Sequence, residues 1–240
     1  TITDTATRTR PVTATLTTMA INMITPILMT EDAALLTLTH WLSPVFPVGG
    51  YAYSQGLESA VETGDVDDAV SLQDWLAVVL EDGTGQADAI FLTAAMAVDA
   101  DHSELDAWAT ALAASSERLQ ETNEQGAAFT RAVNDLKGET SPPVALPIAV
   151  GRAAAFLGLA RERVAALYLQ AMIANLVTGA VRHIPLGQGA GQKVIAGLAP
   201  LILRIATSAV GKSPKDIRSA SFGADRASIA HETQDVRIFR

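Results

Sequence analysis

Apolar side chains recur at helical spacing from about residue 31 onward, and strand-like alternation of apolar and polar residues is nearly absent. Because an apolar period of about 3.6 residues gives a helix one buried face, this pattern predicts an all-α protein. We expect a single compact multi-helix bundle domain of about 8–10 helices, given ordinary helix lengths.

Capping residues and helix breakers divide the pattern into segments. Thr30 can cap a first helix that ends at Leu42, where a loop with two prolines and two glycines follows. Further helices are expected at 51–62, 71–82 (with Ser71 and Asp74 as a capping box), 86–98, from Ser103, 117–136, from Pro142 and Pro143, 161–184 and 192–210 with a kink at Pro200. Residues 228–240 are short, charged and without a clear amphipathic pattern, so we expect them to form an arm.

The domain organisation follows from these segments. Residues 1–30 are rich in Thr, and their composition predicts a flexible, disordered N-terminal extension without a secretory signal. Residues 31–227 should form the helical domain, and 228–240 the C-terminal arm. The native start could lie at Met19, Met23 or Met29.

One segment leaves an alternative open. Residues 164–181 carry no charged side chain, and their length is that of a membrane-helix candidate. However, the segment contains Gln170, Asn175 and Thr178, and much of the rest is Ala, which favours bilayer insertion less than Leu or Ile does. A central helix covered by its neighbours is the preferred interpretation, and a small helical membrane-associated or carrier protein is the alternative.

The charge balance excludes one class of partner. Lys and Arg number 17 against 26 Asp and Glu, so the net charge is −9. A nucleic-acid-binding protein usually carries a basic surface that neutralises phosphates, so we expect no nucleic-acid partner. The chain has no cysteine, which excludes disulfides and thiolate chemistry and agrees with a cytoplasmic location.

Candidate catalytic groups are few. The four histidines lack the spacing of a zinc site. His40 and His183 lie in apolar helical patterns and should be core or partly exposed. His231 and Glu232 should form a solvated pair on the exposed arm, with transient metal binding as the alternative. The glycines of 187–191 lack the preceding strand and the Gly-Lys-Ser/Thr of a phosphate loop. We therefore expect no catalytic, cofactor or metal site.

Three segments instead hold polar and aromatic residues of the types that anchor protein interfaces. They read PVGGYAYSQGLE (47–58), RHIPLGQ (182–188) and HETQDVRIFR (231–240). In this order they resemble the signature of the UreF family of urease accessory proteins, and the resemblance covers about residues 33–240. Residues 123–126 resemble a further family segment more weakly. Tyr51, Ala52 and His183 depart from the residues that the family usually has.

The resemblance implies an all-helical protein without enzymatic activity that forms a homodimer. It also implies binding to UreD (also called UreH) and to the GTPase UreG, in an assembly that delivers nickel to apo-urease. Nickel would be handled by the complex and not held tightly by this chain, and no membrane partner is implied. The motif positions implied to bind partners are Tyr53, Ser54, Gln55, Glu58, Arg182, Gln188, His231, Glu232, Gln234, Arg237 and Phe239.

Two hypotheses about these positions follow. The arm should be mobile alone and order against UreD, since its polar composition offers little apolar area to hold it. Tyr53, Gln55 and Glu58 should lie near a dimer or partner surface, with a core position for Tyr53 as the alternative. A helical metalloenzyme that uses His183, His231 and carboxylates is a further rival.

Overall fold

Helices make up the regular structure of the described part of the chain, which in this computed structural model is residue 1 and residues 29–239. Strands are absent from these residues, which confirms the predicted all-α class. The predictions for the N-terminal extension lie outside the described residues. The α-helices are α1 (Glu31–Trp41), α2 (Leu57–Glu62), α3 (Ala69–Asp82), α4 (Thr84–Ala95), α5 (His102–Ala111), α6 (Ser116–Lys137), α7 (Leu146–Ala154), α8 (Arg161–His183), α9 (Gln188–Ala209) and α10 (Phe222–His231); the 3-10 helices are η1 (Gly50–Ala52), η2 (Ala155–Leu157) and η3 (Pro214–Asp216).

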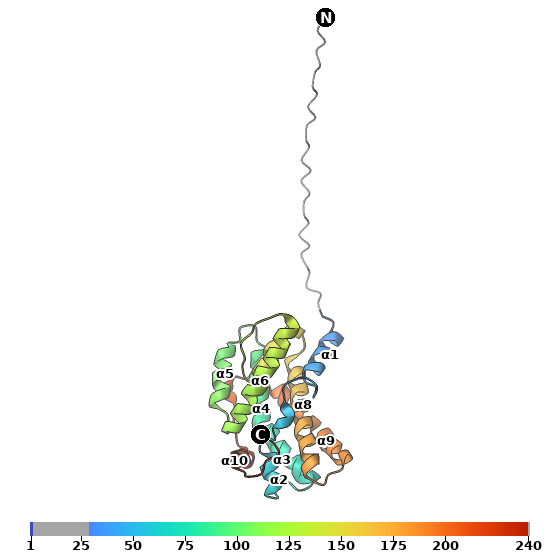
Figure 1. The fold of residues 1–240 in the computed structure, drawn as a ribbon, viewed down its shortest axis with the longest axis vertical. Helices are drawn as coiled ribbons and strands as arrows, with labels where there is room; N and C mark the ends of the chain where they lie inside the picture. Colours follow the sequence, from blue (N-terminus) through green and yellow to red (C-terminus); the bar gives the residue numbers. More distant parts are fainter. Residues whose placement is uncertain (2–28, 240) are drawn as a thin grey trace.

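Helix α4 lies at the centre of the bundle. It contacts α3, α5, α7, α8 and α9, and most of its residues are buried. Figure 1 shows α8 and α9 side by side on one flank, with α5 and α6 on the other. Fully buried apolar side chains fill the space between these helices, and they include Ile90, Leu92, Leu169, Ile173 and Leu198.

The long apolar segment of the sequence corresponds to α8. By length and composition alone, α8 and α9 could each cross a membrane, but core helices of globular proteins pass the same test. Here α8 packs against α9, α4, α2 and α3, so its apolar faces serve the bundle. This packing accounts for the buried part of the uncharged segment, and the rest of the helix is less covered than the preferred interpretation expects.

Several helix boundaries agree with the capping signals. Thr30 Oγ1 accepts a hydrogen bond from the Ala33 N–H at the start of α1. Gly138 ends α6 in the left-handed conformation, with φ of 67°. Pro200 lies inside α9, as predicted, and that helix begins four residues earlier than expected, at Gln188.

Other boundaries were predicted wrongly, each for a local reason. The expected helix from residue 51 is interrupted, because Gln55 and Gly56 both have positive φ and α2 begins only at Leu57. The capping box of α3 joins Asp68 to Ser71, not Ser71 to Asp74. Helix α7 begins at Leu146, after a segment without regular secondary structure that contains Pro142 and Pro143.

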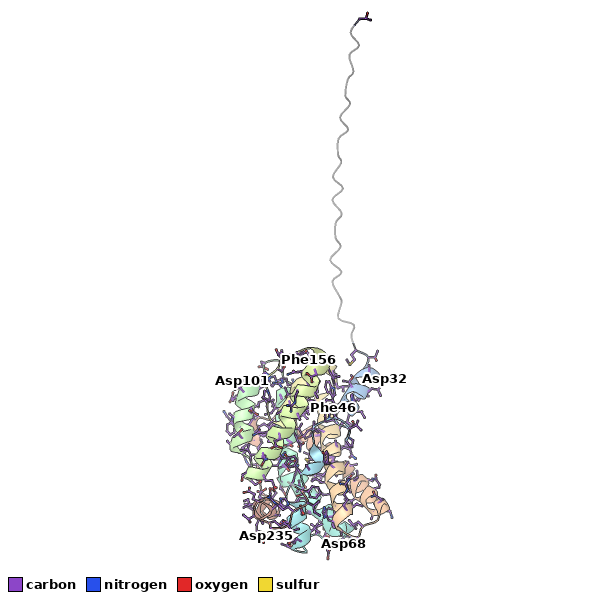
Figure 2. The ribbon with its side chains drawn as sticks, in the orientation of Figure 1. Asp32, Phe46, Asp68, Asp101, Phe156 and Asp235 are labelled. Carbon is purple, nitrogen blue, oxygen red and sulfur yellow. The ribbon has the colours of Figure 1, made fainter. Side chains whose placement is uncertain are left out.

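Helix α10 is absent from the predicted helices, and the expected start of the arm, residue 228, lies within it. Its apolar pattern is weak because polar contacts supply much of its packing. It lies against α2, α6 and α3. Figure 2 labels Asp235 next to α10, at the end of the molecule where α2 also lies.

Candidate partner-binding surface around the C-terminal arm

A tight turn brings α2 against α10. Gln55 and Gly56, both in the left-handed region, turn the chain directly before Leu57. A Cβ on Gly56 would lie 2.5 Å from the backbone N of Ser228, so only glycine permits this approach. The conformation and the contact together explain the glycine of the first motif.

The close approach places His231 between two carboxylates. Its Nδ1 lies 2.7 Å from Glu117 Oε1 on α6, and its Nε2 lies 3.0 Å from Glu58 Oε2 on α2. The ring is fully buried, with 0% of its surface exposed. We call Glu58, Glu117 and His231 the His231 cluster. The prediction that His231 belongs to a solvated pair on an exposed arm is therefore wrong, because long-range carboxylates hold the ring inside the protein.

The end of the chain returns to the same cluster. The backbone N–H groups of Ile238 and Phe239 donate hydrogen bonds to the Glu58 carboxylate, at 2.8 and 3.0 Å. The Phe239 ring packs beside His183, with ring centroids 5.2 Å apart, and against Gly179 of α8. The arm therefore has polar and aromatic attachments to the bundle, which its composition did not reveal.

The two carboxylates of the cluster differ in their surroundings. Burial acts to raise the pKa of Glu58, but hydrogen bonds from His231 and from the two arm amides hold that pKa below its ordinary value. Burial raises the pKa of Glu117, and its contacts with His231 and Arg237 oppose this only in part. Glu58 thus stays ionised more readily than Glu117.

Glu232 fastens the arm at a second place. Its Oε1 accepts hydrogen bonds from the backbone N–H groups of Ser116 and Glu117, at 2.8 and 3.3 Å, in the first turn of α6. Hydrogen bonding to the Ser116 side chain lowers the pKa of Glu232 most, and the two backbone bonds lower it further. A carboxylate there also meets the positive end of the helix dipole. Glu232 therefore caps a helix that is remote in sequence.

A second buried ionic group is centred on Arg118, the residue that follows Glu117 in α6. Arg118 bonds to Asp88 Oδ2 at 2.9 Å and to Glu121 Oε2 at 3.2 Å, and the Tyr168 hydroxyl donates to Asp88 at 2.7 Å. We call Asp88, Arg118, Glu121 and Tyr168 the Arg118 cluster. Burial raises the pKa of Asp88, while Glu121 and Asp88 raise that of Arg118 against the effect of burial.

The first motif connects to this cluster. The Tyr53 hydroxyl donates to Glu124 Oε2 at 2.5 Å, and Gln55 Nε2 donates to Glu121 Oε1 at 3.1 Å. Tyr53 is 5% exposed and Glu58 8% exposed, so both are buried within the chain. Any contact of this segment with another protein would be made through neighbours such as Tyr51, which is 72% exposed.

A cavity of about 330 Å³ lies between the Arg118 cluster and the loop before η1. Its walls are mostly apolar and include Trp41, Phe46 and Met172, while Arg118 and Glu121 lie at its polar part. Cavities that bind small molecules have similar volumes and linings. Here the polar groups already bond to one another, so the cavity offers shape and apolar area more than free hydrogen-bonding groups.

The remaining motif positions are placed as follows. Arg182 is exposed and lines the cavity, and Gln188 is exposed at the start of α9. Arg237 is exposed, with its Nη1 4.0 Å from Glu117 Oε1. Within residues 29–239, the buried Ser54 Oγ and Gln234 Oε1 lack a hydrogen-bonding partner.

The three motif segments thus meet in space. The first and third share Glu58, the second and third meet where Phe239 packs on His183, and the first and second both line the cavity. Sequence reasoning missed Glu117, Asp88, Arg118 and Tyr168. A single sequence does not indicate which charged residues are buried. It showed only that the segment of α6 is more polar than the other helices.

The histidines and carboxylates offer no metal centre in the part of the chain that the structure describes: no group of three such residues is arranged to hold an ion. His40 is exposed and contacts Phe46, and His183 is partly exposed beside Phe239. The rival reading of a metalloenzyme gains no support from these positions.

Comparison with known proteins agrees with the motifs. The UreF family model matches residues 66–199. A urease accessory protein UreF from Cereibacter sphaeroides (strain KD131 / KCTC 12085) is 51% identical over 87% of this chain and 99% of its own length. Proteins of that name from Roseobacter denitrificans and Paracoccus denitrificans are each 47% identical, over 89% and 88% of this chain and 96% and 98% of their own. The chain therefore belongs to the UreF family, whose members are non-catalytic accessory proteins of urease.

Proposed function

We propose that this chain is a docking platform in the cytoplasmic maturation of urease. It acts as a homodimer that holds UreD (UreH) and the GTPase UreG while nickel is delivered to apo-urease. The observation that carries the proposal is the meeting of the three motif segments at one region of the bundle. Helices hold this region in place, and its residues form no arrangement for making or breaking bonds in a substrate.

We further propose that residues 228–240 are the partner-binding arm of a helical domain that spans 31–227. The buried His231 and Glu58 and the half-buried Phe239 fix the arm, and its exposed side chains are free to meet a partner. Val236 and Ile238 are 77% and 71% exposed, and Arg237 lies between them. Exposed apolar residues beside an arginine are typical of interface anchors.

The experiment separates docking from folding. The gene is deleted, and urease is assayed for activity and nickel content after complementation with the full chain or with a chain that carries Val236→Asp and Ile238→Asp. Both substituted side chains are exposed, so the helical fold should remain while co-purification with UreD and urease activation fall. Leu203→Asp, at a 60% exposed position on α9, is the matched control and should leave activation intact.

Normal nickel content in urease without the gene would overturn the proposed function. Normal UreD binding by the doubly substituted arm would overturn the assignment of the arm.

A further inference from the structure

The His231 cluster contains a proton that its geometry requires. An ionised carboxylate only accepts hydrogen bonds, and a neutral imidazole has one N–H and one unprotonated nitrogen. In this cluster both ring nitrogens face carboxylate oxygens, at 2.7 Å and 3.0 Å. Two ionised carboxylates and a neutral ring would therefore leave two acceptors facing each other inside the protein.

The cluster must therefore hold one proton more than two ionised carboxylates and a neutral imidazole do. This proton resides either on the ring or on Glu117. The charged groups around the ring come from three elements. They are Glu58 of α2, Glu117 and Glu121 of α6, and Arg237 and Glu232 of the arm. Arg237 is exposed, and its Nη1 lies 4.0 Å from Glu117 Oε1, farther than the 2.7 Å between that oxygen and His231 Nδ1.

We propose that the His231 cluster is a proton-dependent latch that fixes the C-terminal arm against the bundle. With the proton present, His231 joins α2 to α6, and Glu58 is positioned to accept the arm amides of Ile238 and Phe239. Without it, the unprotonated nitrogen faces a carboxylate, and a buried contact of that kind is unfavourable.

The direction of the pH dependence follows from proton counting. An imidazole that is free in water releases its proton above about pH 6.5. Because the geometry of the latched cluster requires one additional proton and the released arm does not, latching weakens as the pH rises above neutral. At strongly acidic pH the carboxylates are neutralised instead, and the ionic contacts are lost.

This inference deepens the proposed function, because the latch would set how the partner-binding arm is displayed. A fixed arm presents Val236 and Ile238 in one arrangement, whereas a released arm loses the order that Glu58 imposes. The class of regulation is a response to local proton concentration. Its consequence for urease maturation rests on the proposed function, but the latch itself can be tested on the isolated protein.

The test uses a spin label on a single cysteine. The chain has none of its own, so Ile238→Cys gives one labelling site at a side chain that is 71% exposed while its backbone N–H still reaches Glu58. The mobility of the label is measured on the full chain by electron paramagnetic resonance between about pH 6 and about pH 9. A label at Val98→Cys, at a fully exposed position between α4 and α5, controls for direct effects of pH.

We expect the label on the arm to be immobilised near pH 6 and to become mostly mobile near pH 9, while the control does not change. In His231→Gln one amide nitrogen replaces the two ring nitrogens that face Glu117 and Glu58, so its label should be mobile across the range. In Glu117→Gln the amide N–H can donate to an unprotonated ring nitrogen. The label in this variant should therefore stay immobilised both near pH 6 and near pH 9. His183→Gln should keep the pH response, which separates His231 from the ring beside Phe239.

An unchanged label between the two pH values would overturn the latch, as would a pH response in Glu117→Gln equal to that of the original chain. If His231→Gln lowers the helix content measured by circular dichroism, that variant is set aside, and the label mobility of Glu117→Gln alone tests the latch. The measurements involve no partner. A normal pH response together with undiminished UreD binding by the Val236→Asp, Ile238→Asp chain would overturn the proposed role of the arm and leave the latch intact.

Discussion

Two buried groups of polar side chains on the same helix differ in the residue that joins their carboxylates. In the Arg118 cluster a guanidinium joins α6 to Asp88 of α4, and an arginine keeps its charge at every physiological pH. In the His231 cluster an imidazole joins α6 to α2, and its charge depends on pH. The comparison shows how one helix can carry a permanent connection to the core next to a reversible connection to the arm.

The difference in location matches the difference in chemistry. Asp88 belongs to the central helix α4 and Tyr168 to the long helix α8 that packs on it, so loss of the Arg118 cluster would affect the whole fold. Glu58 and His231 belong to the short helix α2 and to the end of α10, at the periphery. Loss of the His231 cluster should release one segment while the remaining helices stay folded.

The largest effect is expected from Arg118→Met. Removing the guanidinium leaves two carboxylates, Asp88 and Glu121, in a buried site without a cation, and such a change costs about 3–5 kcal/mol of unfolding free energy. Urea denaturation followed by circular dichroism measures it. Arg131→Met, at an exposed position of the same helix, should change stability by less than about 0.5 kcal/mol. A loss below about 1 kcal/mol at Arg118 would show that the cluster relaxes and does not anchor the core.

A smaller effect is expected from Gly56→Ala. The new Cβ would meet the backbone of Ser228 at 2.5 Å, so α10 must move away from α2 and the His231 cluster must open. Gly64→Ala is the matched control, because its φ of 79° is close to the 81° of Gly56 and nothing lies within 4 Å of the added carbon. The control should lose about 1–2 kcal/mol from the left-handed backbone alone. Gly56→Ala should lose about 1–3 kcal/mol more, the usual cost of overpacking.

The mobility of the arm is measured in Gly56→Ala and Gly64→Ala as well as their stability. A spin label at Ile238→Cys should become mobile in Gly56→Ala and stay immobilised in Gly64→Ala. Equal losses of stability in the two variants, with equal label mobility, would mean that the contact between α2 and α10 contributes little to the attachment of the arm.

The smallest expected effect is the contribution of Glu58 to the pH dependence of unfolding free energy at acidic pH. Its pKa is lowered in the folded protein from an ordinary value of 4.5, so the unfolded chain binds its proton first as the pH falls. The stability it provides is present above about pH 4.5 and is lost as the pH falls through the lower folded pKa. Glu58→Gln should therefore be less stable than the original chain near pH 6, with the gap narrowing toward pH 3.5.

Urea midpoints at four or five pH values measure that gap. Glu62→Gln, an exposed position of the same helix, is the control and should show no narrowing. A constant gap for Glu58→Gln across the range would mean that the arm amides bind the neutral amide oxygen as well as the carboxylate.

The sequence by itself determined the helical class and most helix positions, because local patterns carry that information. The apolar period of α8 and the caps at Thr30 and Gly138 each act within one helix and can be recognised in the chain. The order of the three motifs likewise sufficed to identify the family. Turn geometry was harder, since the positive φ of Gln55 has no clear signal in the residue type.

Only the tertiary structure decided which charged groups meet. His231 lies 173 positions from Glu58 and 114 from Glu117, and nothing local to any of them indicates that the ring is buried between the two. The same holds for Arg118 and Asp88, which lie 30 positions apart and have no local pattern that indicates their contact. A buried ionic group is stable only when its partners arrive from other elements, so its existence is a property of the packed fold and not of any segment.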